Sequence, residues 1–268
     1  MKNDYSQHFV DTGERPQNFI RDSNMQDRFE EYPQLRNLFR LKDELISIRA
    51  TPPFYLQANL ESFDLRSLGT LFDVVLIDPP WEEYYNRTAH MTTFHTEGVK
   101  PYWSFEEIEK LPIASITAAP AFVFLWVGSG GEALDLGRHL FTTWGFTRSE
   151  DIVWVKTNKE NSRANLNATR EKNSTFIRTK EHCLLGRKGT VRRKTDAHFI
   201  HANVDTDVLI SDEPDLGSLR KPEELYHIIE HFCLGRRRLE LFGEDHNIRP
   251  GWVTIGNKLS SSNWDPDV

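Results

Sequence analysis

The sequence has only two cysteines among its 268 residues, Cys183 and Cys233, and they lie far apart. This excludes a disulfide framework and favours a reducing compartment. No apolar run approaches the ~18 residues needed to cross a bilayer, and residues 1–5 lack the apolar core of a secretory signal. We therefore expect no membrane partner. Hydrophobic residues (38%) and charged residues (27%) occur in the proportions of a globular protein.

The chain also lacks the net positive charge that is usual for a nucleic-acid-binding protein, since its formal charge is −7. However, residues 156–194 contain twelve Lys or Arg against three Glu, a local balance of +9 that leaves −16 for the remainder. A phosphate backbone responds to a local patch and not to the total charge. The segment is therefore a candidate nucleic-acid-binding surface, and a solvated basic loop is the alternative.

Several glycine and histidine signatures are incomplete. A Gly-x-Gly-x-x-Gly fingerprint is absent, which argues against an ordinary nucleotide-binding oxidoreductase. The glycine-rich residues 128–131 lack the Lys-Ser/Thr of a phosphate loop, so we interpret them as a strand-to-helix turn. His227 and His231 fit a His-x-x-Glu-His metalloprotease pattern. No third ligand is evident in the sequence, so we expect no metal.

The hydrophobic pattern alternates between strands and helices. Residues 1–50 predict an arm followed by an amphipathic helix, which Pro52-Pro53 ends. Apolar runs then predict strands at 72–77, 121–127, 151–155, 180–186, 238–242 and 252–255, with helices after Gly131 and after Lys221. This alternation predicts an α/β domain over residues 51–268, with a mostly parallel sheet and helices on both faces. The polar residues 156–180 predict a long loop.

The most specific motif is Asp78-Pro79-Pro80-Trp81, which directly follows the 72–77 strand. Open α/β sheets bind ligands at the carboxyl ends of their strands. A carboxylate there can accept an N–H bond of an exocyclic aromatic amine, and prolines donate nothing, so we expect free, rigidly aimed carbonyls beside it. Trp81 or Tyr102 could stack on an unstacked base. A proline-rich turn with a buried tryptophan is the alternative.

This motif resembles the signature of the eukaryotic adenine-N6 methyltransferases, the family of the mRNA methyltransferase complex. Further strings at residues 124–127, 154–158, 180–184 and 241–243 are also similar to that family, and the likeness covers nearly the whole chain. Residues 7–13, 16–20 and 229–238 are most similar to the methyltransferase-like fourteen branch. Animal subunits of that branch are non-catalytic and have lost the acid and the aromatic of the motif, whereas this chain keeps both Asp78 and Trp81.

The resemblance implies a Rossmann-like S-adenosylmethionine-dependent methyltransferase fold with a permuted motif order, because the donor motifs follow the catalytic motif. By the same likeness, Asp78, Pro79, Pro80, Trp81 and Tyr102 form the catalytic set. The implied donor pocket contains Asn59, Leu60, Asp78, Lys221, Phe242, His246, Asn247, Asn257 and Lys258. Asn59 replaces the usual Asp, and Lys258 and Glu244 replace a Gln and an Arg of the catalytic branch. A carboxylate at Glu244 would repel the donor's own carboxylate.

The implied activity is methyl transfer to adenine N6 in mRNA, within a nuclear heterodimer that contains a methyltransferase-like three-type catalytic subunit. Residues 1–50 would pack on that partner. The basic residues expected to contact RNA are Lys156, Lys159, Arg163, Arg178, Lys180, Lys188, Arg192 and Arg193. The alternatives are a catalytically silent RNA-binding scaffold and a DNA adenine as substrate. For residues 236–238, all arginine, RNA contacts and structural ion pairs are equally open.

Overall fold

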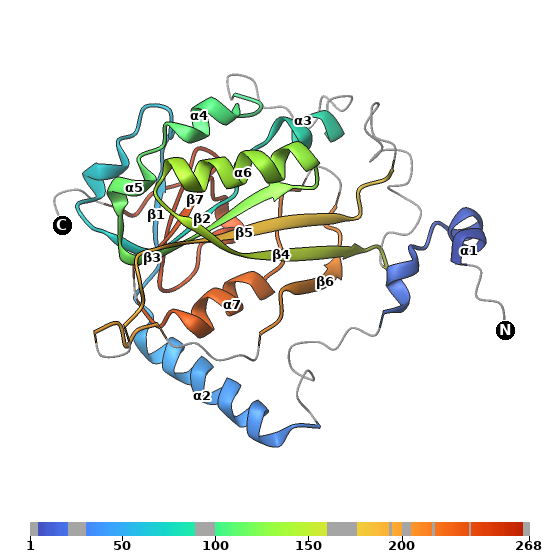
Figure 1. Cartoon of the computed structure of the whole chain (residues 1–268), viewed down its shortest axis with the longest axis horizontal. Coiled ribbons are helices and arrows are strands. Elements are labelled where there is room, and N and C mark those ends of the chain that lie inside the picture. The colour runs from blue at the N-terminus through green and yellow to red at the C-terminus, as the bar shows by residue number, and fades with distance from the viewer. Residues whose placement is uncertain are drawn as a thin grey trace.

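A computed structural model of the chain describes residues 5–20, 31–88, 100–159, 176–192, 195–199, 205–215, 218–235 and 237–264. Within these ranges, eight strands form one sheet in the order β1-β8-β7-β2-β3-β5-β4-β6 (Figure 1). The strands are β1 (Phe54–Gln57), β2 (Phe72–Ile77), β3 (Thr117–Gly128), β4 (Thr147–Thr157), β5 (Lys180–Lys188), β6 (Val208–Asp212), β7 (Arg238–Leu241) and β8 (Trp252–Gly256). Only β5 runs antiparallel to its neighbours, β3 and β4. The predicted mostly parallel α/β fold is confirmed.

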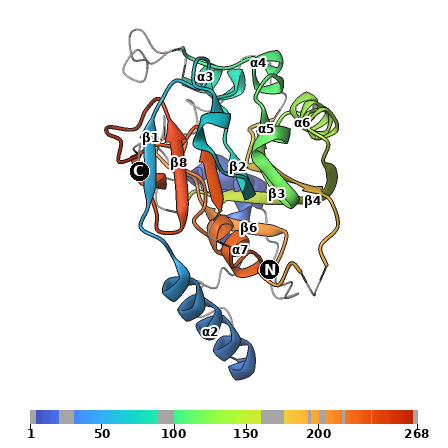
Figure 2. The ribbon, with the colours of Figure 1, turned by 90° about the vertical axis from the view of Figure 1, so that its left-hand side faces the viewer.

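Helices cover both faces of this sheet. The helices α3 (Glu82–Thr88), α4 (Phe105–Glu109), α5 (Ile113–Ile116) and α6 (Gly131–Thr143) lie on one face, and α7 (Glu224–Phe232) and α2 (Pro33–Arg49) on the other (Figures 1 and 2). The helix α1 (Tyr5–Thr12) and short 3-10 turns at Pro16–Phe19, Leu65–Leu68 and Asp245–Asn247 complete the described elements. No described helix is long and apolar enough to cross a bilayer.

Strand β2 lies in the middle of the sheet, between β7 and β3. All six of its residues are buried, which explains why five of them are apolar. The sixth, Asp73, pairs with Arg237. Val75 and Ile77 pack into the core under α6, whereas Val74 and Leu76 pack into the core on the α7 side. Because both faces of a parallel strand are covered, it needs apolar residues at successive positions. The residue that follows Ile77 therefore emerges at the centre of the carboxyl edge.

The neighbouring strands β1, β8, β7 and β2 all run parallel, so their carboxyl ends lie along one edge of the sheet. Apart from Lys221, which lies between β6 and α7, the predicted donor residues follow these four strands, at positions 59–60, 257–258, 242–247 and 78. In the chain, β2 precedes β7 and β8, although all three contribute to one edge. This arrangement accounts for the permuted motif order that the sequence implied.

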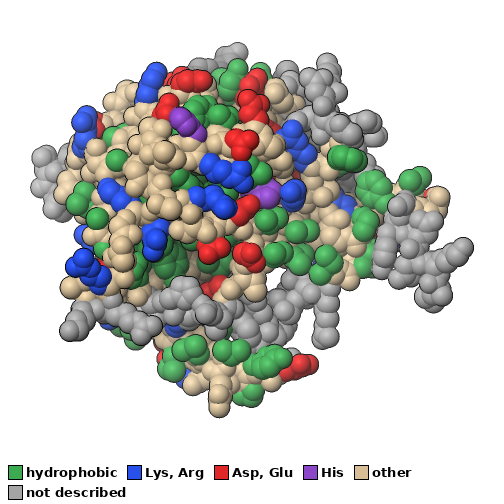
Figure 3. All heavy atoms as spheres, viewed as in Figure 1, with side chains coloured by type: hydrophobic (Ala, Val, Ile, Leu, Met, Phe, Trp, Pro, Cys, Tyr) green, Lys and Arg blue, Asp and Glu red, His purple; other side chains and the backbone are tan. Residues whose placement is uncertain are grey.

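The N-terminal segments are fastened to the body of this same chain. Asn158 donates to the Gly13 carbonyl (3.0 Å) and accepts the Arg15 backbone N–H (3.1 Å). In α2, Lys42 Nζ donates to the His231 carbonyl on α7 (2.9 Å). The remainder of α2 projects from the body (Figure 2), and Leu38, Leu41 and Ile48 are exposed on it. Figure 3 shows hydrophobic side chains exposed on the segment at the bottom of the molecule, where Figure 1 places α2.

Candidate active site

Asp78 lies at the carboxyl end of β2, and 18% of its side chain is exposed. Lys221 Nζ lies 3.4 Å from Asp78 Oδ1. That oxygen is buried and accepts no aligned hydrogen bond from the described part of the chain. Burial raises the pKa of Asp78 to about 7, and the negative charge of Glu181 adds to this effect, although Lys221 opposes it. A carboxyl group with a shifted pKa and an unsatisfied oxygen at a ligand-binding edge is a strong candidate for a functional group.

A small buried network holds Lys221 beside this carboxylate. Lys221 Nζ donates to Glu181 Oε2 (3.0 Å) and to the Tyr84 hydroxyl (3.2 Å), and the same hydroxyl lies 3.1 Å from Glu181 Oε2. The ammonium also lies 4.3 Å from the centre of the Tyr84 ring. Lys221 belongs to the predicted donor set. Glu181 lies in residues 180–184, which resemble the family, but the sequence gave it no role. No pattern in the sequence singled out Tyr84.

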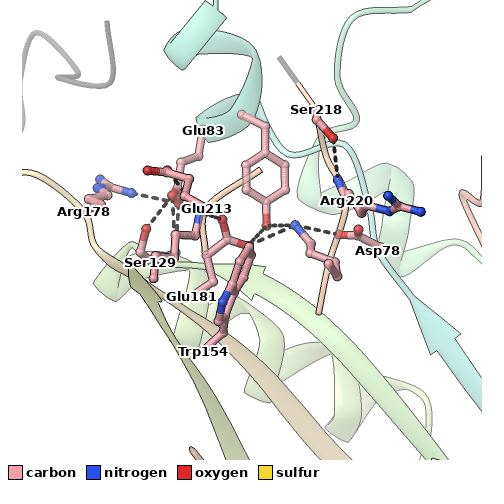
Figure 4. Close-up of polar contacts among 12 residues, drawn as sticks. Asp78, Glu83, Ser129, Trp154, Arg178, Glu181, Glu213, Ser218 and Arg220 are labelled. Carbon is pink, nitrogen blue, oxygen red and sulfur yellow. Dashed lines mark hydrogen bonds and ion pairs between the residues drawn. The ribbon is translucent and has the colours of Figure 1, made fainter. Parts of the chain in front are cut away.

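Figure 4 shows Asp78, Glu181 and Glu213 of this network. From Glu181 the network continues toward the N-terminal arm. Glu181 Oε1 accepts from Lys156 Nζ (2.6 Å), which lies 3.7 Å from Glu213 Oε1. Arg15 Nη2 donates to the other oxygen of Glu213 (2.5 Å). Charges of alternating sign therefore run from the arm to the end of β2, through Arg15, Glu213, Lys156, Glu181, Lys221 and Asp78. Because these side chains are largely buried, each charge depends on its neighbours for compensation.

Trp81 and Tyr102 are the two aromatic residues that the sequence offered for stacking on a base. Trp81 is half-buried, and its Nε1 donates to the Trp126 carbonyl (2.7 Å), which fixes the orientation of the indole without sealing it in the core. Tyr102 is also half-buried, and its ring is tilted against that of Tyr85 at a centroid distance of 5.5 Å. Both aromatics of the predicted stacking pair therefore retain exposed surface.

The two prolines differ from expectation in one respect. Their carbonyls were expected to be free, but the Pro79 oxygen accepts the Trp81 N–H (2.9 Å) and the Pro80 oxygen accepts the Trp103 N–H (3.0 Å). The chain turns back on itself directly after β2, so the nearest N–H groups engage these carbonyls. Each of these carbonyls keeps one lone pair, whereas Asp78 Oδ1 accepts no hydrogen bond from the described residues.

The predicted donor residues occupy the expected edge, but they are not equally available. Leu60 is buried, and Phe242, with a left-handed φ of 67°, packs edge-on against Trp103 at 5.0 Å. Asn247 accepts the Glu244 N–H (2.8 Å) and donates to the Tyr226 hydroxyl (2.7 Å). Its side chain therefore holds the loop after β7 together. Burial lowers the pKa of the half-buried His246.

Glu244 and Lys258, the two departures from the catalytic pattern, form a pair. Lys258 Nζ lies 2.9 Å from Glu244 Oε1. The repulsion expected from an isolated Glu244 is thus offset by the ammonium of Lys258. The exposed Asn59 instead bonds locally, accepting the Glu61 N–H (3.0 Å). The buried Oδ1 of Asp78 and the Glu244–Lys258 pair thus lie at the same edge of the sheet.

The basic residues predicted to contact RNA divide into two groups. Lys156 is only 3% exposed and lies inside the charge network, so a phosphate cannot reach it. Lys188 Nζ donates to the Ala114 carbonyl (2.8 Å), and Arg178 pairs with Glu83 (2.8 Å). The exposed members are Lys159, Lys180 and Arg192, whereas Arg163 and Arg193 lie outside the described residues. On the face in Figure 3, Lys and Arg are interspersed with Asp and Glu.

The glycine-rich turn before α6 is a strand-to-helix turn, as predicted. Glu83 occupies its backbone N–H groups at Ser129 and Gly130 (both 3.3 Å) and accepts from the Ser129 hydroxyl (2.7 Å). A side chain at Gly128 would place Cβ 2.7 Å from Glu83 Oε2, and φ there is +70°. An internal carboxylate thus takes the position that a phosphate would occupy in a phosphate loop.

The arginines at 237 and 238 make structural contacts. Arg237 Nε donates to Asp73 Oδ2 (3.1 Å), and the buried Arg238 donates through Nη2 to the Cys233 carbonyl (2.6 Å). Arg236 lies outside the described residues. Of the two alternatives left open for this run, the structure favours structural ion pairing for Arg237 and structural hydrogen bonding for Arg238.

Comparison with known proteins agrees with this geometry. The MT-A70 family model matches residues 72–258. The chain is 58% identical over 266 residues to the N(6)-adenosine-methyltransferase non-catalytic subunit METTL14 of Xenopus tropicalis, covering 99% of this chain and 56% of that protein. It is 50% identical over 218 residues to the non-catalytic subunit MTB of Arabidopsis thaliana, covering 81% of this chain and 27% of that protein.

The catalytic subunit METTL3 of Homo sapiens is more distant, with 34% identity over 223 residues, covering 82% of this chain and 34% of that protein. The chain spans about half the length of the METTL14 relatives that it matches. The matched family region contains Asp78, the donor loops after β7 and β8, and most of the charge network. On this similarity and on the fold, the chain belongs to the MT-A70 family.

Proposed function

We propose that this chain is a subunit of an adenine-N6 methyltransferase acting on mRNA, and that its own Asp78 site transfers the methyl group. The observation that carries the proposal is the buried, unsatisfied Asp78 Oδ1 at the carboxyl end of the central strand. A purely structural carboxylate at this depth would be expected to have its hydrogen bonds satisfied. Family membership supplies the reaction class.

The chemistry requires an acceptor because the lone pair of an exocyclic adenine amine is delocalised into the ring. Asp78 would accept one N–H of that amine and increase the electron density on nitrogen. S-adenosylmethionine, bound along the edge formed by β1, β8, β7 and β2, would supply an activated methyl group. The fixed indole of Trp81, or Tyr102, would hold the base by stacking. Positioning and electrostatics are the contributions of this chain.

The substrate and the partner belong to the same proposal. The relatives' names refer to N6-adenosine and to catalytic and non-catalytic subunits, which supports a heterodimer with a METTL3-type protein. The exposed Lys159, Lys180 and Arg192 would contact the RNA backbone. The apolar surface of α2, with Leu41 and Ile48 exposed, would pack on the partner. We further propose a nuclear location, where mRNA is modified.

A silent scaffold is the second candidate, and three observations favour it. The METTL14 relatives are named non-catalytic subunits. Asn247 is occupied by structural hydrogen bonds, and the Glu244–Lys258 pair stands at the donor edge. In this function the chain would bind RNA and support an active partner, and Asp78 would contribute nothing to the reaction.

Calorimetry of the chain with S-adenosylmethionine tests the proposal. The wild-type chain should bind the donor, and Asp78→Asn should weaken binding roughly 10- to 100-fold, as expected for the loss of a charged hydrogen bond. Asp135→Asn is the matched control, because Asp135 is 79% exposed on α6 and pairs only with Arg138 among the described residues. Absence of measurable donor binding to the wild-type chain would favour the scaffold.

A further inference from the structure

A second cluster of ionisable side chains lies where α2 meets α7, outside the Asp78 network. His227 and His231 are one helical turn apart, so both project from the same side of α7. Asp43 reaches them from α2, with its Oδ1 2.9 Å from His231 Nε2. One ligand atom from each of Asp43, His227 and His231 lies within 4.8 Å of the others. The sequence alone gave no third ligand because Asp43 precedes His231 by 188 residues.

His231 faces a carboxylate on each side of its ring. Its Nε2 faces Asp43, and its Nδ1 lies 3.6 Å from Asp205 Oδ2. A neutral imidazole has one N–H and one lone pair, so it can donate to only one of these carboxylates. The other contact would set a lone pair against a negative charge, with the His231 side chain only 2% exposed. Nε2 makes a hydrogen bond with Asp43, whereas the buried Nδ1 has no hydrogen-bond partner among the described residues. A second proton on the ring, or a metal ion on Nε2 that leaves the N–H on Nδ1 facing Asp205, removes this conflict.

We propose that Asp43, His227 and His231 bind a divalent transition metal of the zinc class. Imidazole nitrogen and carboxylate oxygen are ligands that zinc prefers, and two histidines at i and i+4 on a helix are a common pair. Asp205 supports the assignment. A carboxylate behind a metal-bound histidine fixes its tautomer, which leaves the other ring nitrogen to bind metal. The fourth position would be open to water.

The present distances are compatible with closure around an ion. Ligand atoms at ~2.0–2.1 Å from a tetrahedral zinc lie about 3.4 Å apart, compared with at most 4.8 Å here. Asp43, whose side chain is 56% exposed, and the half-buried His227 have room to rotate inward. The buried His231 would stay in place, because it is 2% exposed and packs against the ring of Phe39 at 4.9 Å.

A metal at this position would fasten α2 to the body of the protein. Other contacts of this junction include the Lys42 bond to the His231 carbonyl and the packing of Phe39 against the His231 ring. A metal shared by the two helices would therefore fix the direction in which α2 projects, with Leu41 and Ile48 exposed on it. The site does not depend on methyl transfer, so its test is independent of the proposed function.

The experiment is a titration of the chelator-treated chain with Zn²⁺ and Co²⁺ at pH 8, followed by calorimetry and by visible absorption of the cobalt form. We expect a single equivalent to bind, with the absorption of four-coordinate cobalt. His227→Ala and Asp43→Asn should each lower affinity 100-fold or more, and Asp205→Asn should lower it about 10- to 100-fold. His139→Ala is the matched control, because this exposed histidine on α6 pairs with Glu109 and should leave binding unchanged.

Two results would overturn the assignment. One is the absence of stoichiometric binding by the wild-type chain, which would leave a proton as the cation that His231 holds. The other is equal affinity in the wild-type chain, His227→Ala and Asp43→Asn, which would place any bound metal elsewhere. Circular dichroism of the variants checks that they fold, since Asp43 and His227 are not buried.

Discussion

Replacement of Asp78 by Asn should stabilise the fold at neutral pH while it removes activity. Asn has nearly the shape of the protonated carboxyl group and cannot ionise. The pKa of Asp78 is raised by burial to about 7 from an ordinary value of 3.8. Between these values the folded protein holds a proton that the unfolded chain has released, so the wild type loses stability as pH rises from 3.8 to about 7. The raised pKa means that Lys221 offsets only part of the cost of burying this charge.

The size of the effect follows from the two pKa values. A difference of about 3 units at ~1.4 kcal/mol per unit corresponds to roughly 4 kcal/mol, fully expressed above pH 7. At pH 5 only about 1–2 kcal/mol of this loss has developed. The stability advantage of Asp78→Asn should therefore be about 2–3 kcal/mol larger at pH 8 than at pH 5. The comparison of two pH values cancels any pH-independent packing cost of the amide.

The assay is urea unfolding of the wild type, Asp78→Asn and the exposed control Asp135→Asn at both pH values. Asp135→Asn should not raise the free energy of unfolding by a comparable amount at either pH, because 79% of the Asp135 side chain is exposed to solvent. If the difference between Asp78→Asn and wild type is the same at pH 5 and pH 8, the carboxyl group titrates normally. The reasoning that burial leaves Asp78 under-compensated would then be refuted.

Three further predictions concern the charge network, RNA and catalysis. Arg15→Leu should lower the free energy of unfolding by about 2–4 kcal/mol, because it removes the nearer cation from the largely buried Glu213 and leaves Lys156 at 3.7 Å. Arg40→Leu, at an exposed i,i+4 pair, should lower it by less than about 1 kcal/mol. Similar losses for the two variants in urea unfolding would contradict a buried network. The double change Arg192→Glu and Arg193→Glu should weaken RNA binding and reduce the dependence of the affinity on salt concentration. If the slope of log affinity against log salt concentration is the same as in the wild type, these two arginines do not contact the RNA backbone. The rate of methyl transfer should rise about tenfold per pH unit up to about pH 7 and then level off, because Asp78 must be ionised to accept an N–H of the adenine amine. A rate that does not change from acid to neutral pH would show that the Asp78 carboxylate is not this acceptor.

Local patterns in the sequence were sufficient to predict the central elements. The apolar run that forms β2 and the following Asp78 could be located because a buried parallel strand and a ligand-binding carboxyl edge both leave local signals. Strands β1 and β6 were not predicted. Each has four or five residues, and burial in β1 is incomplete, so neither shows a continuous apolar run.

The charge network could not be predicted from spacing. Lys221 lies 40 residues from Glu181 and 137 from Tyr84 in the chain, and only the pairing of distant strands brings them together. Lys156 illustrates the opposite error. Its position in a basic segment indicated a surface residue, but it lies at the end of β4, where Glu181 and Glu213 compensate its buried charge. Local charge density does not reveal which lysine has an acidic partner.

Contacts between residues far apart in the chain also went unpredicted where α2 meets α7. The helix was predicted from its periodicity, and its length agrees with the arm-and-helix interpretation of residues 1–50. Its contact with His231 through Asp43 is a tertiary feature. From the sequence, His227 and His231 were two possible metal ligands without a third. The fold brings the Asp43 carboxylate beside them.

Whether this chain has a methyltransferase site of its own can be decided with a heterodimer whose METTL3-type subunit has been inactivated at its catalytic aspartate. We expect this heterodimer to retain residual transfer to adenine N6, and we expect that transfer to disappear when Asp78→Asn is added in this chain. Complete loss of transfer on inactivation of the partner alone, with full activity retained by Asp78→Asn beside an intact partner, would contradict this expectation.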